Sequence, residues 1–290
     1  MNEDEKVEVV KILHINKEVA NKNITNKKRQ NFENLKFLHN GIKDNIYFYT
    51  LDNSKQIYCF FDIYFLIINY NLDIGFDKNK NKENKDKLYN EYQKGTDFEK
   101  CEEYFAYYIN EKNGNEIASM AIRNSKTLRP NEKNSYDNDD IKAIFDARAF
   151  AVLYKFNQDK SKFLRLLILF ILGIAYNKKM LEFLDSVYVA HKNQDINKMI
   201  TIRDNFLAYD LAIYFTYPVK PESHQTYENW LRISDVLAVK NTHNEIKSQI
   251  SDLVQVIYNK QKDSQNRKWT ILATAIAAFS LFASIVALIK

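Results

Sequence analysis

One stretch of the sequence constrains the fold more than any other. Residues 269–289, WTILATAIAAFSLFASIVALI, carry no charged side chain. A helix of this length, at ~1.5 Å rise per residue, is roughly 30 Å long, which matches the hydrocarbon core of a bilayer. A buried core helix is the alternative, although such helices rarely lack charge over so many residues. The sequence therefore predicts a single transmembrane helix at 269–289.

The charges around this segment predict its orientation. Basic residues gather immediately before it, whereas only Lys290 follows it. Cytoplasmic flanks of membrane helices carry an excess of Lys and Arg, and Trp is enriched at the interface. Residues 1–10 are acidic and lack the apolar segment of a signal peptide. We therefore expect a single-pass protein of the inner membrane with its N-terminal bulk in the cytoplasm. The residues expected to contact lipid headgroups are Lys260, Lys262, Arg267, Lys268 and Trp269.

Small residues follow one side of the expected membrane helix at alternating spacings of three and four. In lipid, helices associate through close packing of such small side chains. This pattern favours self-association, although Ala and Ser are also common in solitary membrane anchors. The expected seam consists of Thr270, Ala273, Ala277, Ser280, Ser284 and Ala287.

Few residues in the sequence interrupt regular structure. Among 290 residues there are only 5 Gly and 3 Pro, which argues for long helices over a sandwich or barrel of many strands. The 42 basic residues are interspersed with 37 acidic ones, giving a net charge of only +5, so direct binding of nucleic acid is not expected. We expect a mainly α protein with a smaller N-terminal α/β part.

The N-terminal part contains the strand signals. Residues 6–15 alternate between polar and apolar, and 46–50 with 56–61 read as a hairpin across Asp-Asn-Ser-Lys. Residues 62–72 fit a strand or a buried helix, because periodicity does not decide a short apolar run. Residues 77–87 are charged and of low complexity, which is typical of a loop.

From about residue 90 the pattern favours helices. We expect one or two amphipathic helices in 89–112 and another in 141–156, the latter capped by Asp139 or Asp140. Residues 161–179 predict a buried core helix, because the uncharged run inside them is too short to span a membrane; a re-entrant or interfacial segment is the alternative.

Further helices are expected at 180–193 and 195–216, and a long one at 225–268 after Pro218 and Pro221. The long helix reads as a stalk that ends in the basic collar before the membrane. Its apolar seam consists of Ile246, Ile250, Leu253 and Ile257, at the 4,3,4 spacing of a coiled coil.

The expected organisation has four parts, with the polar interval 124–140 as the boundary between the first two. These parts are an N-terminal α/β domain at 1–123, a helical domain at 141–224, the stalk and collar at 225–268, and the membrane helix at 269–289.

Residue patterns of known catalytic and metal sites are missing from the sequence. There is no Gly-rich phosphate loop, dinucleotide fingerprint, His-Glu-x-x-His or Cys-rich metal motif. A cation at Asp137, Asp139 and Asp140 is disfavoured, because the Gly and distal Glu of a calcium loop are lacking. Cys59 and Cys101 are expected to be free thiols, with a single disulfide between them as the alternative. The five histidines, which lie in separate segments, are expected to be ordinary surface residues: His14, His39, His191, His224 and His243. We therefore expect no enzymatic activity, no metal and no cofactor.

The last third of the sequence resembles the stalk and first membrane helix of CorA-like proteins. The resemblance covers 199–215, 228–258 and 264–277, and includes Asp235-Val236 in the long helix, Asn266 and Arg267 in the turn, and Ile271-Leu272-Ala273-Thr274 at the membrane entry. It implies an N-terminal α/β cytoplasmic domain ahead of the stalk, and a pentamer.

The sequence departs from that family beyond the membrane entry. The Gly-Met-Asn signature and the second span are absent, so selective magnesium transport does not follow from the resemblance. Divergent CorA-like proteins also act as membrane effectors in prokaryotic antiviral systems.

Three functions remain open from the sequence. The first is an oligomeric membrane effector, in which a cytoplasmic domain senses a ligand or protein partner and acts on the membrane span through the stalk. The second is a passive membrane scaffold that tethers a cytoplasmic partner, and the third is a degenerate CorA-type divalent cation transporter.

Overall fold

A computed structural model describes residues 6–33, 35–73, 101–110, 135–137, 141–154 and 160–289. The chain divides into two compact units. The first unit comprises residues 1–181 and 209–243, and the second comprises 182–208 and 244–290. Helices α5, α6 and α8 each contribute residues to both units.

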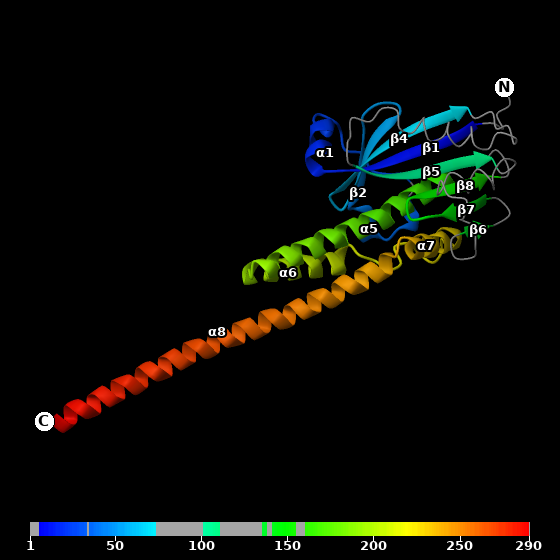
Figure 1. Cartoon of the computed structure of the whole chain (residues 1–290). Helices are drawn as coiled ribbons and strands as arrows, with labels where there is room; N and C mark the ends of the chain where they lie inside the picture. Colours follow the sequence, from blue (N-terminus) through cyan, green and yellow to red (C-terminus); the bar gives the residue numbers. More distant parts are fainter. Residues whose placement is uncertain are drawn as a thin grey trace, which may run out of the picture. The chain divides into compact units, whose positions relative to one another are not determined.

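The first unit contains a mixed sheet of eight strands in the order β2-β3-β4-β1-β5-β8-β7-β6 (Figure 1). All neighbouring strands are antiparallel except β5 and β8, which run parallel. The strands are β1 (Lys6–Ile15), β2 (Ile46–Thr50), β3 (Lys55–Phe60), β4 (Ile63–Asp73), β5 (Glu102–Asn110), β6 (Ser135–Asp137), β7 (Ile141–Phe145) and β8 (Ala149–Tyr154).

The structure confirms the strand expected at 6–15 and the hairpin expected at 46–50 and 56–61. It also decides the ambiguous segment 62–72, which is strand β4. Strand β4 pairs with β1 on one side and with β3 on the other. The charged segment 77–87 lies outside the described residues.

Two helix predictions in this half of the chain were wrong. Residues 102–110, within the segment 89–112 expected to be helical, form strand β5. Residues 141–156 were expected to be one helix, yet they contain the antiparallel strands β7 and β8. Most residues of β7 and β8 are buried, so their apolar run lacks the alternation that marks a half-exposed strand. The expected caps Asp139 and Asp140 lie outside the described residues.

The polar interval 124–140 lies within the span of this single sheet, because β5 precedes it and β8 follows it and the two strands pair directly. Of the interval itself the structure describes only Ser135–Asp137, which is strand β6.

Helix α5 (Ser161–Lys192) covers one face of the sheet. Its Phe163 and Phe170 contact Phe150 of β8 at ring-centroid distances of 5.8 and 5.1 Å, and Phe170 also contacts Tyr104 of β5. The expected core helix at 161–179 is confirmed, since its residues 166–176 are buried. The separate helix expected at 180–193 is instead the continuation of α5.

The opposite face of the sheet carries two apolar clusters, in keeping with the side-chain alternation of strands. Part of this face is covered by helix α1 (Lys17–Ile24), whose Ala20 is fully buried in the second cluster. The short helices η2 (Leu35–Phe37) and α2 (Asn40–Lys43) lie between α1 and β2 in the chain.

The C-terminal part is helical, as expected, with α6 (Ile196–Ala212), α7 (His224–Val236) and α8 (Val239–Ile289). The single helix expected at 225–268 was wrong in one respect, because the chain breaks it at Leu237 and Ala238. Ala238 adopts a positive φ of 53°, which no helix residue has. After this break α8 runs on for 51 residues.

Burial in the second unit follows the expected apolar seam. Ile246, Ile250, Leu253 and Ile257 of α8 are all at most 3 % exposed. Met199, Ile202 and Phe206 of α6 and Ala190 of α5 are buried in the same unit. Phe183 of α5 meets Phe206 edge to face at 5.5 Å.

Among the residues whose side chains the structure describes, which end at Ile276 on α8, no helix is long and apolar enough to cross a membrane. The side chains of 277–289 lie outside the described residues.

Candidate functional site

The most constrained feature outside the sheet is the junction between α7 and α8. Ala238 is held in a left-handed conformation that costs an alanine roughly 1–2 kcal/mol. Its amide donates to the carbonyl of Asp235 at 3.0 Å, and the Asn177 side chain of α5 donates to the carbonyl of Leu237 at 2.6 Å. These contacts hold the break between α7 and the first turn of α8 in place.

Helix α5 lies unusually close beneath this junction. A Cβ atom at Gly173 would lie only 2.6 Å from Cδ1 of Leu237 and 3.3 Å from Cγ2 of Ile233. Leu237 and Val239, which flank the break, are both buried. Glycine at 173 thus allows the contact between α5 and the start of α8.

Aromatic rings connect the sheet to the first turns of α8. Phe61, in the β3–β4 turn, stacks on Tyr176 of α5 at 5.4 Å, and Tyr176 meets Tyr214 at 5.1 Å. Tyr214 stacks on His243 of α8 at 3.8 Å with the rings 9° apart. We call Phe61, Tyr176, Tyr214 and His243 the aromatic column; all four belong to the first unit.

The turn that presents Phe61 is backbone-strained. Phe61 and Asp62 have φ values of 55° and 66°, in the region that favours glycine. The side chain of Phe61 is nevertheless 6 % exposed, and its amide donates to the carbonyl of Asn45 at 3.1 Å. Burial of the ring against Tyr176 and Tyr209 offsets the strain.

His243 forms the polar end of the column. Its Nε2 lies 2.6 Å from Oδ1 of Asp210 near the end of α6, and the two side chains are only 8 % and 16 % exposed. An imidazole and a carboxylate at this distance share a strong hydrogen bond. The pair ties the start of α8 to the end of α6 within the first unit.

Tyr176 lies at the centre of this arrangement. Its hydroxyl donates to the carbonyl of Ile213 at 3.1 Å and accepts the amide of Phe215 at 3.4 Å. Burial raises the pKa of Tyr176 far above its ordinary value. Burial also raises the pKa of Tyr214, and the nearby Asp210 carboxylate adds to that effect. Both phenols therefore act as neutral hydrogen-bonding groups at physiological pH.

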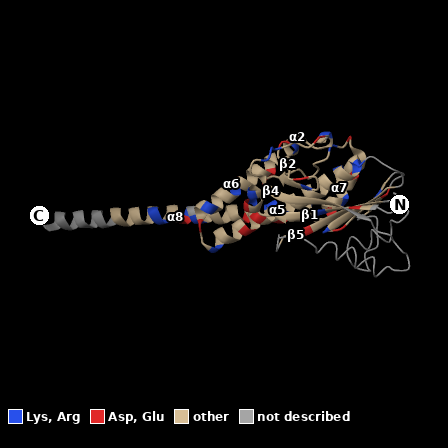
Figure 2. Ribbon diagram, turned by 90° about the horizontal axis from the view of Figure 1, so that it is seen from above, with Lys and Arg blue, Asp and Glu red and all other residues tan. Residues whose placement is uncertain are grey.

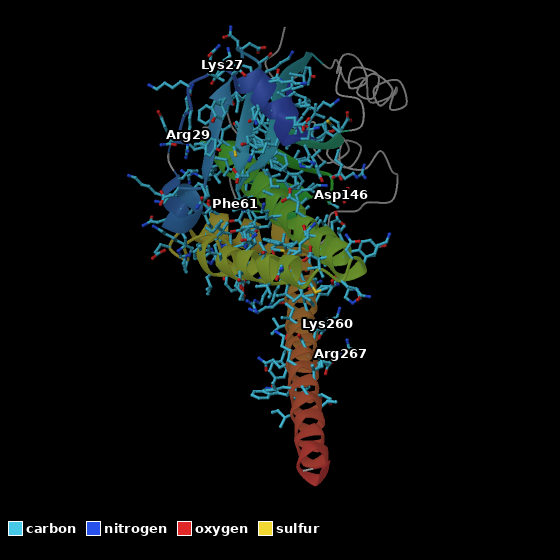
Figure 3. All side chains as sticks on the ribbon, turned by 90° about the vertical axis from the view of Figure 1, so that its left-hand side faces the viewer. Lys27, Arg29, Phe61, Asp146, Lys260 and Arg267 are labelled. Carbon is cyan, nitrogen blue, oxygen red and sulfur yellow. The ribbon has the colours of Figure 1, made fainter. Side chains whose placement is uncertain are left out.

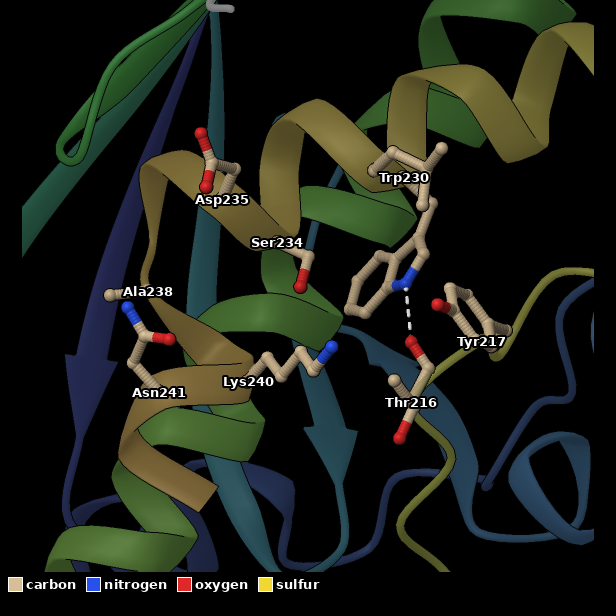
Figure 4. Close-up of a pocket in the computed structure, with 9 residues that line it drawn as sticks. Thr216, Tyr217, Trp230, Ser234, Asp235, Ala238, Lys240 and Asn241 are labelled. Carbon is tan, nitrogen blue, oxygen red and sulfur yellow. Dashed lines mark hydrogen bonds between the residues drawn. The ribbon is translucent and has the colours of Figure 1, made fainter. Parts of the chain in front are cut away.

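A small polar cavity opens beside the junction (Figure 4). It has a volume of about 210 Å³, and Trp230 forms its buried wall. The indole nitrogen of Trp230 donates to the carbonyl of Thr216 at 3.0 Å. Lys240 of α8 extends toward this pair, while Ser234 and Asp235 line the side formed by α7. The cavity places groups from α7, α8 and the segment before α7 within one small space.

The residues expected to contact lipid headgroups follow the buried seam of α8. Lys260 is half-buried, whereas Lys262, Arg267, Lys268 and Trp269 are exposed, with Trp269 69 % exposed. Figure 2 marks cations of this collar on α8, and Figure 3 labels Lys260 and Arg267. The collar belongs to the second unit, whereas the aromatic column belongs to the first.

The expected membrane seam is described only in part. Thr270 and Ala273 are exposed in this single chain, and the Thr270 hydroxyl donates to the carbonyl of Asn266 at 2.9 Å. The side chains of Ala277, Ser280, Ser284 and Ala287 lie outside the described residues.

The described part of the chain contains no group of three or more His, Cys, Asp or Glu side chains that could hold a metal ion. Asp137 instead lies 3.6 Å from Lys142. Cys59 and Cys101 are both free, and burial raises the pKa of each thiol.

Sequence reasoning missed the aromatic column and treated His243 as a surface residue, which was wrong: it is 6 % exposed. Its position gave a partial signal, because His243, Ile246 and Ile250 follow one another at spacings of three and four on the buried side of α8. The partners on α5 and α6 had no such signal.

Comparisons of the chain with models of known protein families, with curated proteins and with solved structures found no match.

Proposed function

We propose that this protein is a C-terminally anchored, oligomeric membrane effector. In this proposal the first unit senses a ligand or partner in the cytoplasm, and α8 carries the response to a membrane span at 269–289 that opens or permeabilises the bilayer. The resemblance to CorA-like effectors suggests antiviral defence as the biological setting.

The observation that carries the proposal is the continuity of α8. The same helix begins in the first unit, where His243 is buried against Tyr214 and Asp210, and continues through the collar into the uncharged segment. From His243 to Trp269 the helix extends about 40 Å at ~1.5 Å per residue. A change in the contacts that hold His243 would therefore act on the helix that leads to the expected span.

Two further features support a mechanical role over a catalytic one. The backbone between α7 and α8 is held by the close approach at Gly173, the hydrogen bond from Asn177 and the left-handed conformation of Ala238. A junction held in this way can pass a movement of α7 on to the start of α8. The collar supplies cations next to the uncharged segment, and each contributes about 1 kcal/mol of attraction near an anionic leaflet.

The deciding experiment compares the full chain with a 1–268 truncation in cells. We expect the full chain to depolarise the membrane and to slow growth in at least one of two conditions, namely with or without phage infection. The truncation should do neither in either condition. A full chain that leaves potential and growth normal in both conditions would contradict the proposal.

Self-association within the membrane is tested by the seam. Replacing Ala277 and Ser284 with leucine should abolish oligomerisation or membrane toxicity, because larger side chains hold the helices apart. The matched control enlarges two side chains outside the small-residue seam, with Leu281→Phe and Ile285→Phe. Equal behaviour of both pairs would argue against a small-residue interface.

The scaffold hypothesis makes the opposite prediction for the span. If the chain only tethers a partner, an unrelated transmembrane helix in place of 269–289 should preserve its activity. Ion flux that depends on this helix and selects divalent cations would instead favour the transporter hypothesis.

A further inference from the structure

A second cavity, remote from the α7–α8 junction in sequence, lies in the first unit beside the edge strand β2. Its volume is about 530 Å³, within the range of roughly 300–1,000 Å³ that is typical of small-molecule sites. Residues of 29–32, 35–36 and 40–44 form its walls, with Phe32 and Leu35 as the apolar part. It is therefore large enough for a metabolite.

The charged groups of this cavity are predominantly basic. Arg29, Lys36 and Lys43 line it, against the single carboxylate of Asp44. Within the described residues, no ion pair joins any of these three cations to a carboxylate. Three cations against one carboxylate give the lining a net positive charge, which attracts anions.

Backbone and ring contacts hold the cavity walls in place. The Arg29 guanidinium lies over the Tyr47 ring at 3.8 Å. The adjacent Gln30 exchanges two backbone hydrogen bonds of 2.9 Å with Phe48 of β2. Both contacts hold the chain at Arg29 and Gln30 against the edge strand β2.

The opposite wall is joined to the segment that leads into α7. Leu38 pairs with Val219, through hydrogen bonds from the His39 amide to Pro218 and from the Lys220 amide to Phe37. His39 also stacks on Phe215 at 5.2 Å. Phe215 in turn bonds to the Tyr176 hydroxyl of the aromatic column.

We propose that this cavity binds a small molecule with two or more adjoining phosphoryl groups, through Arg29, Lys36 and Lys43. Phosphoryl oxygens match the fork of an arginine and the point charges of lysines, and a multiple negative charge outweighs the single Asp44 carboxylate. This inference rests on the proposed function, for which the cavity would be the sensing site. Ligand bound in the cavity would act on residues 218–220, which pair with 37–39, and through them on α7.

Calorimetric titration of inorganic pyrophosphate into the purified full chain, in uncharged detergent at low salt, tests the proposal. We expect saturable binding that the double variant Lys36→Gln, Lys43→Gln weakens at least about tenfold, since each lost charge-assisted contact costs affinity. Asp44→Asn should tighten binding, because it removes the repelling carboxylate.

The matched control is Lys17→Gln with Lys22→Gln, which removes the same charge from the exposed face of α1. Absence of saturable binding would overturn the proposal, as would equal weakening by the control and cavity variants. The variant Asp44→Asn keeps the test decisive if the lysine variants fold poorly, because unchanged affinity there also contradicts the proposal.

A second titration identifies the source of the phosphoryl group. Water-soluble, short-chain diacylglycerol pyrophosphate represents a lipid headgroup with two adjoining phosphoryl groups, and inorganic pyrophosphate represents a free metabolite. The probe that binds more tightly through Lys36 and Lys43 identifies the ligand type. On binding, hydrogen exchange should slow at the amides of His39 and Lys220, which bridge the two segments.

These measurements are independent of the membrane effect. Binding of a probe without depolarisation in cells would contradict the proposed effector function but not the phosphoryl site. Depolarisation by a chain that binds neither probe would contradict the phosphoryl site but not the effector function.

Discussion

Replacing His243 with phenylalanine is expected to destabilise the first unit by about 1.5–3 kcal/mol. The substitution keeps a ring against Tyr214 but removes the 2.6 Å contact with Asp210, and a hydrogen bond to a charged group is worth about that much. His243→Ala also removes the stacked ring, whose contact contributes a further 0.5–1.5 kcal/mol or so. The alanine variant should therefore be the less stable of the two.

The assay is urea denaturation of the full chain in detergent, followed by circular dichroism. His191→Phe is the matched control, because His191 is an exposed histidine at the end of α5 and should change stability by less than about 0.5 kcal/mol. Combining His243→Phe with Asp210→Asn closes a double-mutant cycle, in which we expect a coupling energy of about 1 kcal/mol or more. Additive effects of the two substitutions, or a His243→Phe variant as stable as the control, would refute the assigned role of this pair.

Three other perturbations test separate parts of the structure. Ile250→Ala should cost about 2–5 kcal/mol and increase hydrogen exchange in the second unit, whereas the control Val254→Ala, at a site 39 % exposed, should be nearly neutral in the same measurement. Tyr176→Phe should cost about 1–3 kcal/mol at neutral pH, because it leaves the carbonyl of Ile213 without that donor. The raised pKa of Tyr176 means that its neutral form stabilises the fold below pH ~10 and that this contribution is lost at higher pH, so the variant should lose less stability than the wild type on titration to pH 11; an identical alkaline loss would contradict this. Replacing Lys260 and Lys262 with glutamine should weaken association with anionic vesicles by about 1 kcal/mol per residue, measured by sedimentation against neutral vesicles, and an unchanged affinity would exclude them as headgroup contacts.

Local sequence was sufficient wherever one periodicity dominated. The alternation in 6–15 predicted β1, and the apolar residues at 246, 250, 253 and 257 predicted the buried side of α8. The pattern in α8 arises because one side of the helix is buried and the other is exposed, whereas β1 keeps its polar residues Glu8 and His14 only half-buried between buried apolar ones. The same reasoning predicted the buried middle of α5, where an uncharged run is too short for a membrane.

Local sequence was insufficient where both sides of an element are buried. Strands β7 and β8 were predicted to be helical because they lack the alternation of a half-exposed strand. Strand β8 pairs with β7, its neighbour in the sequence, and also with β5, about 45 residues earlier in the chain. The break at Ala238 was equally hidden, since Asp-Val-Leu-Ala-Val contains neither glycine nor proline. Asn177, 60 residues away, supplies one of the hydrogen bonds that stabilise it.

For the proposed function, the sequence by itself determined the parts that depend on composition over a short stretch: the uncharged segment 269–289, the basic collar and the apolar seam of α8. Only the tertiary structure decided what the start of α8 is attached to. His243, Tyr214, Tyr176 and Phe61 come from four separate segments, and the basic cavity is joined to the lead into α7 by the Leu38–Val219 pairing. Contacts of this kind form only after the chain has folded, because each depends on groups that are distant in sequence and leave no periodic pattern in it.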